Sequence, residues 1–167
     1  MRKTTLCYVV KDGRVLLAMK KRGFGLGKWN GPGGKVQDGE TPEQGCRREF
    51  MEEAGCGLVG LKERGIVEFV FEDKPEWHQL CHIYVAADVE GEPHETEEML
   101  PQWHGLDGLP WANMWESDAV WLSAVLGGGT VNMRIFFDAD CKMLRHKMFD
   151  CIIGFAFCCL KFVVFIS

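Results

Sequence analysis

The chain has 167 residues, of which 47% are hydrophobic and 26% charged, a composition that fits one soluble globular domain and excludes a disordered chain. The net charge of −5 argues against a long nucleic acid as partner. The eight cysteines include no C-x-x-C pair, which argues against structural zinc. Reduced thiols predict a cytoplasmic protein, with the nucleus and the mitochondrion as alternative locations.

The chain begins with an expected β-hairpin. Residues 4–10 and 14–22 are rich in strand-forming side chains, and Asp12-Gly13 between them is typical of a tight turn. Six of the twelve residues in "GFGLGKWNGPGG", residues 23–34, are glycine. This composition predicts a loop whose backbone passes close to another group.

A helix is expected over residues 42–54. Thr41 is a favourable N-cap, Pro42 suits the first helical position, and Gly55 is a typical helix terminator.

The second half of the chain completes an expected α/β/α sandwich, in which a mixed β-sheet lies between helices. Alternating apolar runs favour long strands over residues 57–73 and 78–91, separated by a turn at Lys74-Pro75. Residues 92–110 predict an acidic loop that enters a short strand, residues 111–128 a second helix ended by glycines, and residues 131–137 and 141–148 a closing hairpin.

The C-terminal end differs from the rest in composition. We expect residues 1–148 to form the domain and residues 149–167 to be a separate apolar tail. A membrane anchor, a core strand and an altered terminus are the alternatives for this tail. A spanning helix needs about 20 apolar residues and tolerates a central lysine poorly, so the length of the run and Lys161 argue against the anchor.

Three glutamates of the expected helix have a spacing that brings their side chains together. Glu49, Glu52 and Glu53 stand at i, i+3 and i+4 and therefore share one face of the helix. Clustered carboxylates repel one another, and a hard divalent cation such as Mg²⁺ removes that repulsion. A solvated acidic helix face is the alternative for the same spacing.

The surrounding residues favour the metal. From Gly34 the chain reads G-x5-E-x7-R-E-F-x-E-E-x-G-C, which resembles the Nudix box, the signature of hydrolases that cut nucleoside diphosphates linked to another group. Cys56 stands where the family prefers an aliphatic residue, a small departure because cysteine packs as a small hydrophobe. The resemblance implies a Nudix-type α/β/α sandwich and a pyrophosphohydrolase that uses Mg²⁺, with Mn²⁺ as a substitute.

The resemblance also implies roles for individual residues. Arg48 would pair with Glu40 and hold the loop against the helix. The general base would be Glu53 or Glu98, although Glu98 could instead be a solvated loop charge. The implied metal ligands are Gly34, Glu49, Glu52, Glu53 and Glu98, and the implied catalytic residues are Glu49, Glu53, Glu98 and Arg48.

Outside the box, "VLLAMKKRGFGLGKWNGPGGKVQDGET" and "LPQWHGLDGLPWANMW" resemble the eukaryotic MutT-like members, which hydrolyse oxidised purine nucleoside triphosphates such as 8-oxo-dGTP and 2-oxo-dATP to the monophosphate and pyrophosphate. The likeness extends from about residue 5 to residue 146. Packing in the sheet core is the alternative role for Phe69 and Phe71. Trp115 could instead anchor its helix, and Lys20 could be a surface charge. The implied substrate residues are Thr5, Lys20, Phe24, Asn30, Phe69, Phe71, Trp115 and Asp118.

One residue departs from that pattern. The resembled members have two adjacent aspartates after the stacking tryptophan and a proline, whereas this chain has Ser117 followed by Asp118. Two neighbouring acids can share a proton and so read bases with different donor patterns. We therefore expect an oxidised guanine substrate to be retained and 2-oxo-adenine hydrolysis to weaken.

The prediction is thus a monomeric enzyme that acts on a nucleoside triphosphate. Two alternatives remain open on the sequence. One is a Nudix hydrolase of methylated or normal nucleoside triphosphates or of dinucleoside polyphosphates. The other is a non-catalytic nucleotide-binding module, which the intact glutamates of the box disfavour.

Overall fold

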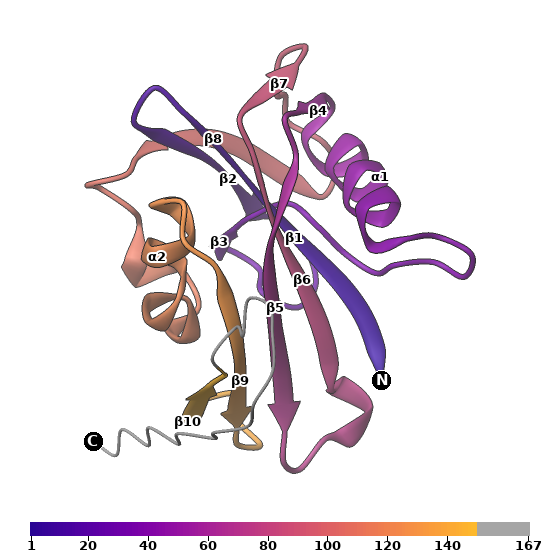
Figure 1. The fold of residues 1–167 in the computed structure, drawn as a ribbon, viewed down its shortest axis with the longest axis vertical. Coiled ribbons are helices and arrows are strands. Elements are labelled where there is room, and N and C mark those ends of the chain that lie inside the picture. Colours follow the sequence, from indigo (N-terminus) through magenta and orange to yellow (C-terminus); the bar gives the residue numbers. More distant parts are fainter. Residues whose placement is uncertain (150–167) are drawn as a thin grey trace, which may run out of the picture.

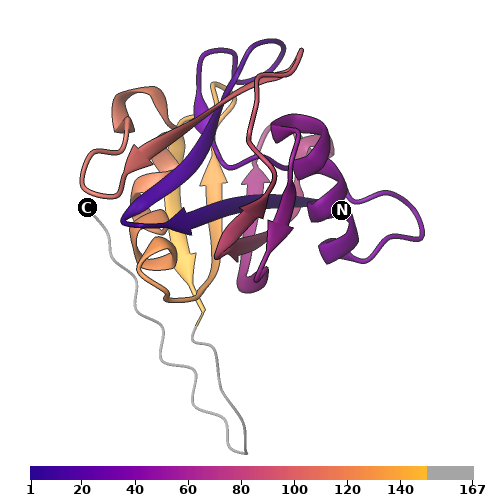
Figure 2. The ribbon, with the colours of Figure 1, turned by 90° about the horizontal axis from the view of Figure 1, so that it is seen from above.

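A computed structural model describes residues 1–149 of the chain. Figures 1 and 2 show a twisted mixed sheet with helix α1 on one side and helix α2 on the other, so the expected α/β/α architecture is confirmed. The helices are α1 (Pro42–Ala54) and α2 (Leu122–Leu126), with the 3-10 turns η1 (Pro75–Trp77), η2 (Trp111–Asn113) and η3 (Glu116–Val120). The strands are β1 (Arg2–Lys11), β2 (Arg14–Lys20), β3 (Trp29–Asn30), β4 (Gly57–Val59), β5 (Lys62–Phe71), β6 (Gln79–Ala86), β7 (Asp88–Glu90), β8 (Met99–Gly105), β9 (Val131–Phe137) and β10 (Met143–Met148).

The main sheet has the strand order β10-β9-β5-β6-β1-β2-β3, and β8 pairs with β2 off this path. Strands β1 and β6 are parallel, as are β5 and β9, and the other neighbours are antiparallel. Strands β4 and β7 form a separate two-stranded ribbon. The predicted hairpins β1–β2 and β9–β10 are both confirmed.

The first turn has the geometry that its residues predict. Asp12 and Gly13 both have positive φ, at 50° and 71°, and Lys11 pairs with Arg14 across the turn. Two consecutive residues with positive φ match the right-handed twist of a two-residue hairpin.

Helix α1 begins and ends where its caps predict. The Thr41 hydroxyl accepts the Gln44 N–H at 3.2 Å, and the Gln44 side chain accepts the Thr41 N–H at 2.8 Å, which completes a capping box. Gly55 ends the helix in the left-handed conformation, with φ 72°.

The sheet separates two hydrophobic cores because side chains alternate along each strand. On β1, Cys7 and Val9 pack with Phe50 of α1, whereas Tyr8 faces the opposite side and packs with Leu122 of α2. Full burial of a side chain such as Phe50 stabilises the fold by roughly 2–3 kcal/mol. Both layers are therefore fixed to the strand that also carries Thr5.

The single helix predicted over residues 111–128 is wrong. The segment forms η2, η3 and α2 in succession, because Met114 and Trp115 have extended ψ values of 176° and 137°. Met114 is 2% exposed, so packing of its side chain into the core outweighs the local helical preference. The break sets Trp115 at the start of η3, where it borders the cavity described below.

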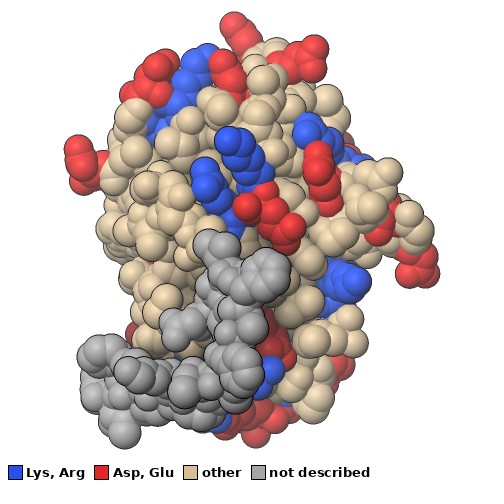
Figure 3. All heavy atoms as spheres, viewed as in Figure 1, with Lys and Arg blue, Asp and Glu red and all other residues tan. Residues whose placement is uncertain are grey.

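The apolar tail lies outside the described residues, apart from Phe149, and its expected alternatives stay predictions. Within residues 1–149, no helix has the length and apolar character to cross a bilayer. On the face shown in Figure 3, basic side chains lie beside acidic ones, and no continuous basic stripe crosses the described part of that face.

Candidate active site

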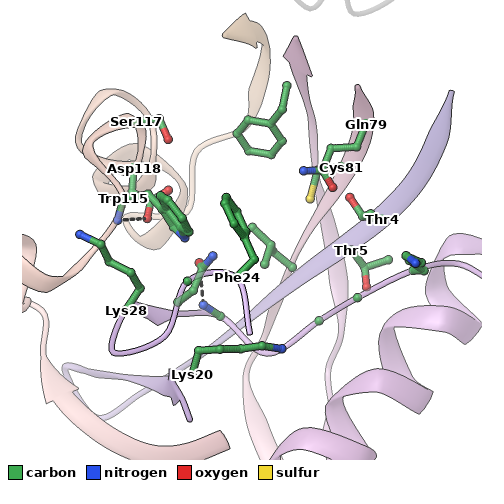
Figure 4. Close-up of a pocket in the computed structure, with 18 of the residues that line it drawn as sticks. Thr4, Thr5, Lys20, Phe24, Lys28, Gln79, Cys81, Trp115, Ser117 and Asp118 are labelled. Carbon is green, nitrogen blue, oxygen red and sulfur yellow. Dashed lines mark hydrogen bonds between the residues drawn. The ribbon is translucent and has the colours of Figure 1, made fainter. Parts of the chain in front are cut away.

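A cavity of about 390 Å³ opens between the glycine-rich loop, the central strands and η3. Figure 4 shows Phe24 standing between Trp115 on one side and the Thr4, Cys81 and Gln79 side chains on the other. Every residue that the sequence assigned to substrate binding lines this one cavity: Thr5, Lys20, Phe24, Asn30, Phe69, Phe71, Trp115 and Asp118.

The glycine-rich loop brings an aromatic ring to the cavity. Phe24 stacks on Trp115, with 5.1 Å between the ring centroids and 21° between the planes, and meets Trp77 edge-on at 5.3 Å. Gly25 is needed for this approach, because its φ is 84° and a Cβ there would lie 3.0 Å from the Trp115 ring. The backbone of the glycine-rich loop was expected to pass close to another group, and at Gly25 that group is the Trp115 ring.

Asn30 is fixed in one orientation. Its Oδ1 accepts the Tyr8 hydroxyl and the Gly31 N–H, each at 2.8 Å. Since both donors occupy the carbonyl oxygen, the amide NH₂ remains to bind a ligand. Asn30 therefore offers donors to the cavity.

Asp118 is a buried acid in the same cavity, 2% exposed. Burial raises the pKa of Asp118 to about 7, while the Trp115 N–H bonded to Oδ2 at 3.3 Å and the charge of Lys28 oppose the increase. Ser117, 3% exposed, lies beside it and also borders the cavity. This corner of the cavity thus holds one carboxyl group and one hydroxyl group.

Phe69 and Phe71 border the cavity and also belong to the core. Phe71 is 6% exposed and stacks on Phe137, with centroids 4.9 Å apart, and Phe69 packs against the same ring at 6.1 Å. Thr5 lies deeper, at 1% exposed, and within residues 1–149 its hydroxyl has no hydrogen-bond partner. That hydroxyl is available to a ligand.

The glycine loop also connects the cavity to helix α1. Glu53 is 5% exposed, and its Oε2 accepts the Gly33 N–H at 2.8 Å. The Lys20 Nζ lies 3.6 Å from Glu53 Oε1. Burial raises the pKa of Glu53 to about 7, and the charges of Glu49 and Glu98 add to the increase.

Glu49 lies directly against Gly34. A Cβ at Gly34 would fall 2.3 Å from Glu49 Oε2, so a larger residue there requires this carboxylate to shift. The expected Arg48–Glu40 pair is present, with nitrogen–oxygen distances of 2.7 and 3.0 Å, and Arg48 also contacts Glu49 at 2.8 Å. Hydrogen bonds from Arg48 lower the pKa of Glu40 to about 2.

The remaining acids lie further out. The Glu52 side chain is 59% exposed and 3.5 Å from Arg48. Glu98 is bonded to Arg22 and lies 3.6 Å from Lys20, and the Arg22 hydrogen bond lowers the pKa of Glu98. The Gly34 carbonyl already accepts the Thr5 N–H at 2.8 Å.

The carboxylates of Glu49, Glu53 and Glu98 are suitable ligands for a hard divalent cation. In this structure each of them lies beside a cationic side chain. In the described part of the chain, no three acidic, histidine or cysteine side chains gather closely enough to chelate an ion. Lys20 instead lies 3.6 Å from both Glu53 and Glu98, and Arg48 contacts Glu49. Oxygen donors, a buried carboxylate and a glycine cradle are the features of a Mg²⁺ site that shares its ligands with phosphates.

Sequence reasoning missed several residues that line the cavity, among them Arg2, Lys28, Gln79 and Cys81. Arg2 and Gln79 are neighbours in the parallel β1–β6 register, and Cys81 follows Gln79 on the same face of β6. Lys28 lines the cavity and donates to the Met114 carbonyl at 2.9 Å. Period-2 alternation along β6 was the available signal for Gln79 and Cys81, whereas their pairing with β1 is not local in sequence.

Comparison with known proteins agrees with this geometry. Residues 1–125 match the protein family described as "NUDIX domain". The chain is 51% identical over 144 residues to an "oxidized purine nucleoside triphosphate hydrolase" of Danio rerio. The matched residues make up 86% of this chain and 92% of the relative. The protein of that name from Mus musculus is 49% identical over 122 residues, 73% of this chain and 78% of the relative. A solved MutT protein from Bacillus halodurans superposes with a TM-score of 0.79 at 26% identity, over 89% of this chain and 97% of that one.

Proposed function

Because the chain belongs to the Nudix family of hydrolases, we propose that it converts oxidised purine nucleoside triphosphates, 8-oxo-dGTP above all, to the monophosphate and pyrophosphate. One observation carries the proposal. A single cavity holds the residues suited to a purine, such as Asn30 and Asp118, and reaches Lys20, Gly33 and Gly34 beside the glutamates of α1. The names of the zebrafish and mouse relatives support the same substrate class.

The polar groups of the cavity suit a guanine base, and oxidation at C8 leaves the edge that they would bind unchanged. The Asn30 NH₂ can donate to a ring carbonyl, and an ionised Asp118 can accept from ring N–H groups. Guanine presents a carbonyl beside N–H donors, whereas adenine presents an amino group beside an unprotonated ring nitrogen. Trp115 and Phe24 add stacking that every purine shares, worth roughly 1–3 kcal/mol per base.

We propose Mg²⁺ as the metal, with Mn²⁺ as a substitute. Glu49, Glu53 and Glu98 would hold it, with Glu52 and Gly34 at the edge of the site. When bound, the ion neutralises phosphate charge and promotes formation of a nucleophilic water.

The chain's own residues orient the reaction. The Gly33 N–H fixes one oxygen of Glu53, which leaves the other directed toward Lys20. We assign Glu53 as the base that accepts the proton of the attacking water, because Glu98 is engaged by Arg22. Water then adds to one of the two phosphorus atoms of the α–β phosphoanhydride, that bond breaks, and the nucleoside monophosphate and pyrophosphate separate. Lys20 lies where it can bind the phosphate chain.

The test is a panel of nucleoside triphosphates with Mg²⁺, scored for pyrophosphate release. It comprises 8-oxo-dGTP, 2-oxo-dATP, a methylated purine triphosphate and the four normal deoxynucleotides. We expect the highest kcat/KM for 8-oxo-dGTP and a lower value for 2-oxo-dATP. Preference for a methylated or normal nucleotide would replace the substrate assignment, and absence of any hydrolysis would refute the enzymatic one.

A further inference from the structure

The loop of residues 91–98, which joins β7 to β8 and carries Glu98, is held against the end of α1. The last four carbonyls of a helix have no partner within the helix. Here the Ala54 carbonyl accepts the His94 N–H at 3.0 Å, and the Glu53 carbonyl accepts the Thr96 hydroxyl at 3.3 Å. The loop therefore caps the same helix end that carries Glu53.

The Thr96 hydroxyl also binds the backbone that leads into Glu98. It accepts the N–H groups of Glu98 at 3.3 Å and of Met99 at 3.1 Å. A hydroxyl has one proton and two lone pairs, so the two N–H groups use both lone pairs, and the proton is directed to the Glu53 carbonyl, with the Met99 carbonyl at 3.5 Å as a second acceptor. One side-chain oxygen thus bridges the backbone carbonyl of Glu53 and the backbone amide of Glu98.

Gly55 and Lys21 also hold the same loop. A Cβ on Gly55 would lie 1.9 Å from the His94 ring. The absence of a side chain at Gly55 therefore allows the imidazole to pack against the end of α1. Lys21 donates from its Nζ to the Thr96 carbonyl at 2.7 Å and from its backbone N–H to the Glu98 carbonyl at 2.8 Å. Thr96 joins the backbone of α1 to the backbone of Glu98 through one side chain, whereas Lys20 faces the carboxylates of Glu53 and Glu98.

We propose that Thr96 is a positioning residue that keeps Glu98 beside Glu53. Thr96 does not line the cavity, and it acts on the reaction through Glu98. The consequence is the arrangement around Lys20, whose Nζ lies 3.6 Å from a carboxylate oxygen of each acid. This role rests on the proposed function, which assigns Glu98 to the phosphate end of the site.

Removal of the hydroxyl tests the proposal. Thr96→Val keeps the β-branched shape and leaves the Glu53 carbonyl and the Glu98 amide without their shared partner. We expect kcat for 8-oxo-dGTP to fall by about 10- to 100-fold, the loss typical of residues that orient a metal ligand. KM should change by less than about threefold because the base-binding end is untouched. Thr96→Ser should restore most of kcat, and Thr130→Val, at an exposed threonine, is the matched control.

A double-mutant cycle separates positioning from general stability. If Thr96 acts through Glu98, Thr96→Val should reduce kcat by less than about twofold in a Glu98→Gln background. Losses that multiply would overturn the proposal, and so would wild-type kcat in the single Thr96→Val variant.

Amide hydrogen exchange gives a readout that needs no turnover. Exchange at Glu98 and Met99 should become faster in Thr96→Val, return in Thr96→Ser and stay unchanged in Thr130→Val. Unchanged exchange in Thr96→Val would contradict the bridge. If the wild-type chain prefers another nucleotide, the proposed substrate is wrong. The double-mutant cycle is then measured with the preferred nucleotide and still tests the role of Thr96. If it hydrolyses none, hydrogen exchange alone decides the bridge.

Discussion

Phe24 stacks on Trp115 with their ring centroids 5.1 Å apart and their planes 21° from parallel. These are two of the residues that the sequence assigned to purine binding. A base inserted between two rings needs about 7 Å, twice the usual contact distance between stacked carbon atoms. A purine that stacks on Trp115 from the Phe24 side must therefore push Phe24 outward, and the Phe24 ring, 61% exposed on a glycine-rich loop, can then cover the other face of the base.

Phe24→Ala is expected to weaken nucleotide binding through loss of a stacking partner. A stacking contribution of about 1–3 kcal/mol corresponds to a rise in KM for 8-oxo-dGTP of roughly 5- to 150-fold. Leu26→Ala is the matched control, because Leu26 lies on the same loop, is 66% exposed and does not line the cavity. Steady-state kinetics of the two variants checks this, and equal KM values would contradict a binding role for Phe24.

Asp118 should make folding stability depend on pH. Burial raises its pKa to about 7 from an ordinary 3.8, so the folded state holds this proton where the unfolded state has released it. Because the folded pKa is the higher one, the stabilisation is fully present below about pH 4 and is lost as pH rises through 7. The full difference is on the order of 4 kcal/mol.

Asp118→Asn is expected to flatten that dependence, since the amide stays neutral at every pH. Denaturant unfolding between pH 4 and 8 measures it, with Asp107→Asn at an exposed position as control. If the free energy of unfolding of Asp118→Asn depended on pH as steeply as that of the wild type, Asp118 would not be a buried acid with a raised pKa.

Ser117→Asp is expected to change which oxidised base is preferred. A second carboxyl group beside Asp118 can share its proton and offer both a donor and an acceptor, which suits 2-oxo-adenine as well as oxidised guanine. One added charged hydrogen bond of about 1.5–3 kcal/mol corresponds to a rise of roughly 10- to 100-fold in relative kcat/KM for 2-oxo-dATP. Competition between the two triphosphates measures the ratio of their kcat/KM values. An unchanged ratio would show that residue 117 does not determine which oxidised base is preferred.

Gly34→Ala should impair the phosphate end and leave the base end intact. The new Cβ would lie 2.3 Å from Glu49 Oε2, so the carboxylate must move. A displacement of about 1 Å at a reacting group can reduce kcat by about 100-fold. Gly105→Ala, where a Cβ meets nothing within 4 Å, is the control and should retain wild-type kcat. Similar kcat values for the two variants would show that the close contact between Gly34 and the Glu49 carboxylate is not needed for catalysis.

Local sequence signals predicted the elements whose ends are set by local bonds. Thr41, Gln44 and Gly55 fix the bounds of α1 through bonds within four residues, so residues 42–54 were predicted correctly. The Asp12-Gly13 turn is equally local.

Features set by tertiary contacts were not predictable in the same way. The break before η3 depends on burial of Met114, which no neighbouring residue signals. Gln79 enters the cavity through its register with Arg2, from 77 residues earlier in the chain. Thr96 carries no motif, and its bond to Glu53 joins residues 43 positions apart.

The proposed function requires that the glutamates of α1 act on the phosphate chain of a nucleotide whose base lies in the adjoining cavity. The decisive measurement is Mg²⁺-dependent release of pyrophosphate from 8-oxo-dGTP by Glu53→Gln. Glu43→Gln is the matched control, since Glu43 lies on the same helix and pairs with Arg47. We predict that kcat falls by about 10²- to 10⁴-fold in Glu53→Gln and stays at the wild-type value in Glu43→Gln. Wild-type turnover by Glu53→Gln would contradict the assignment of α1 to the chemistry.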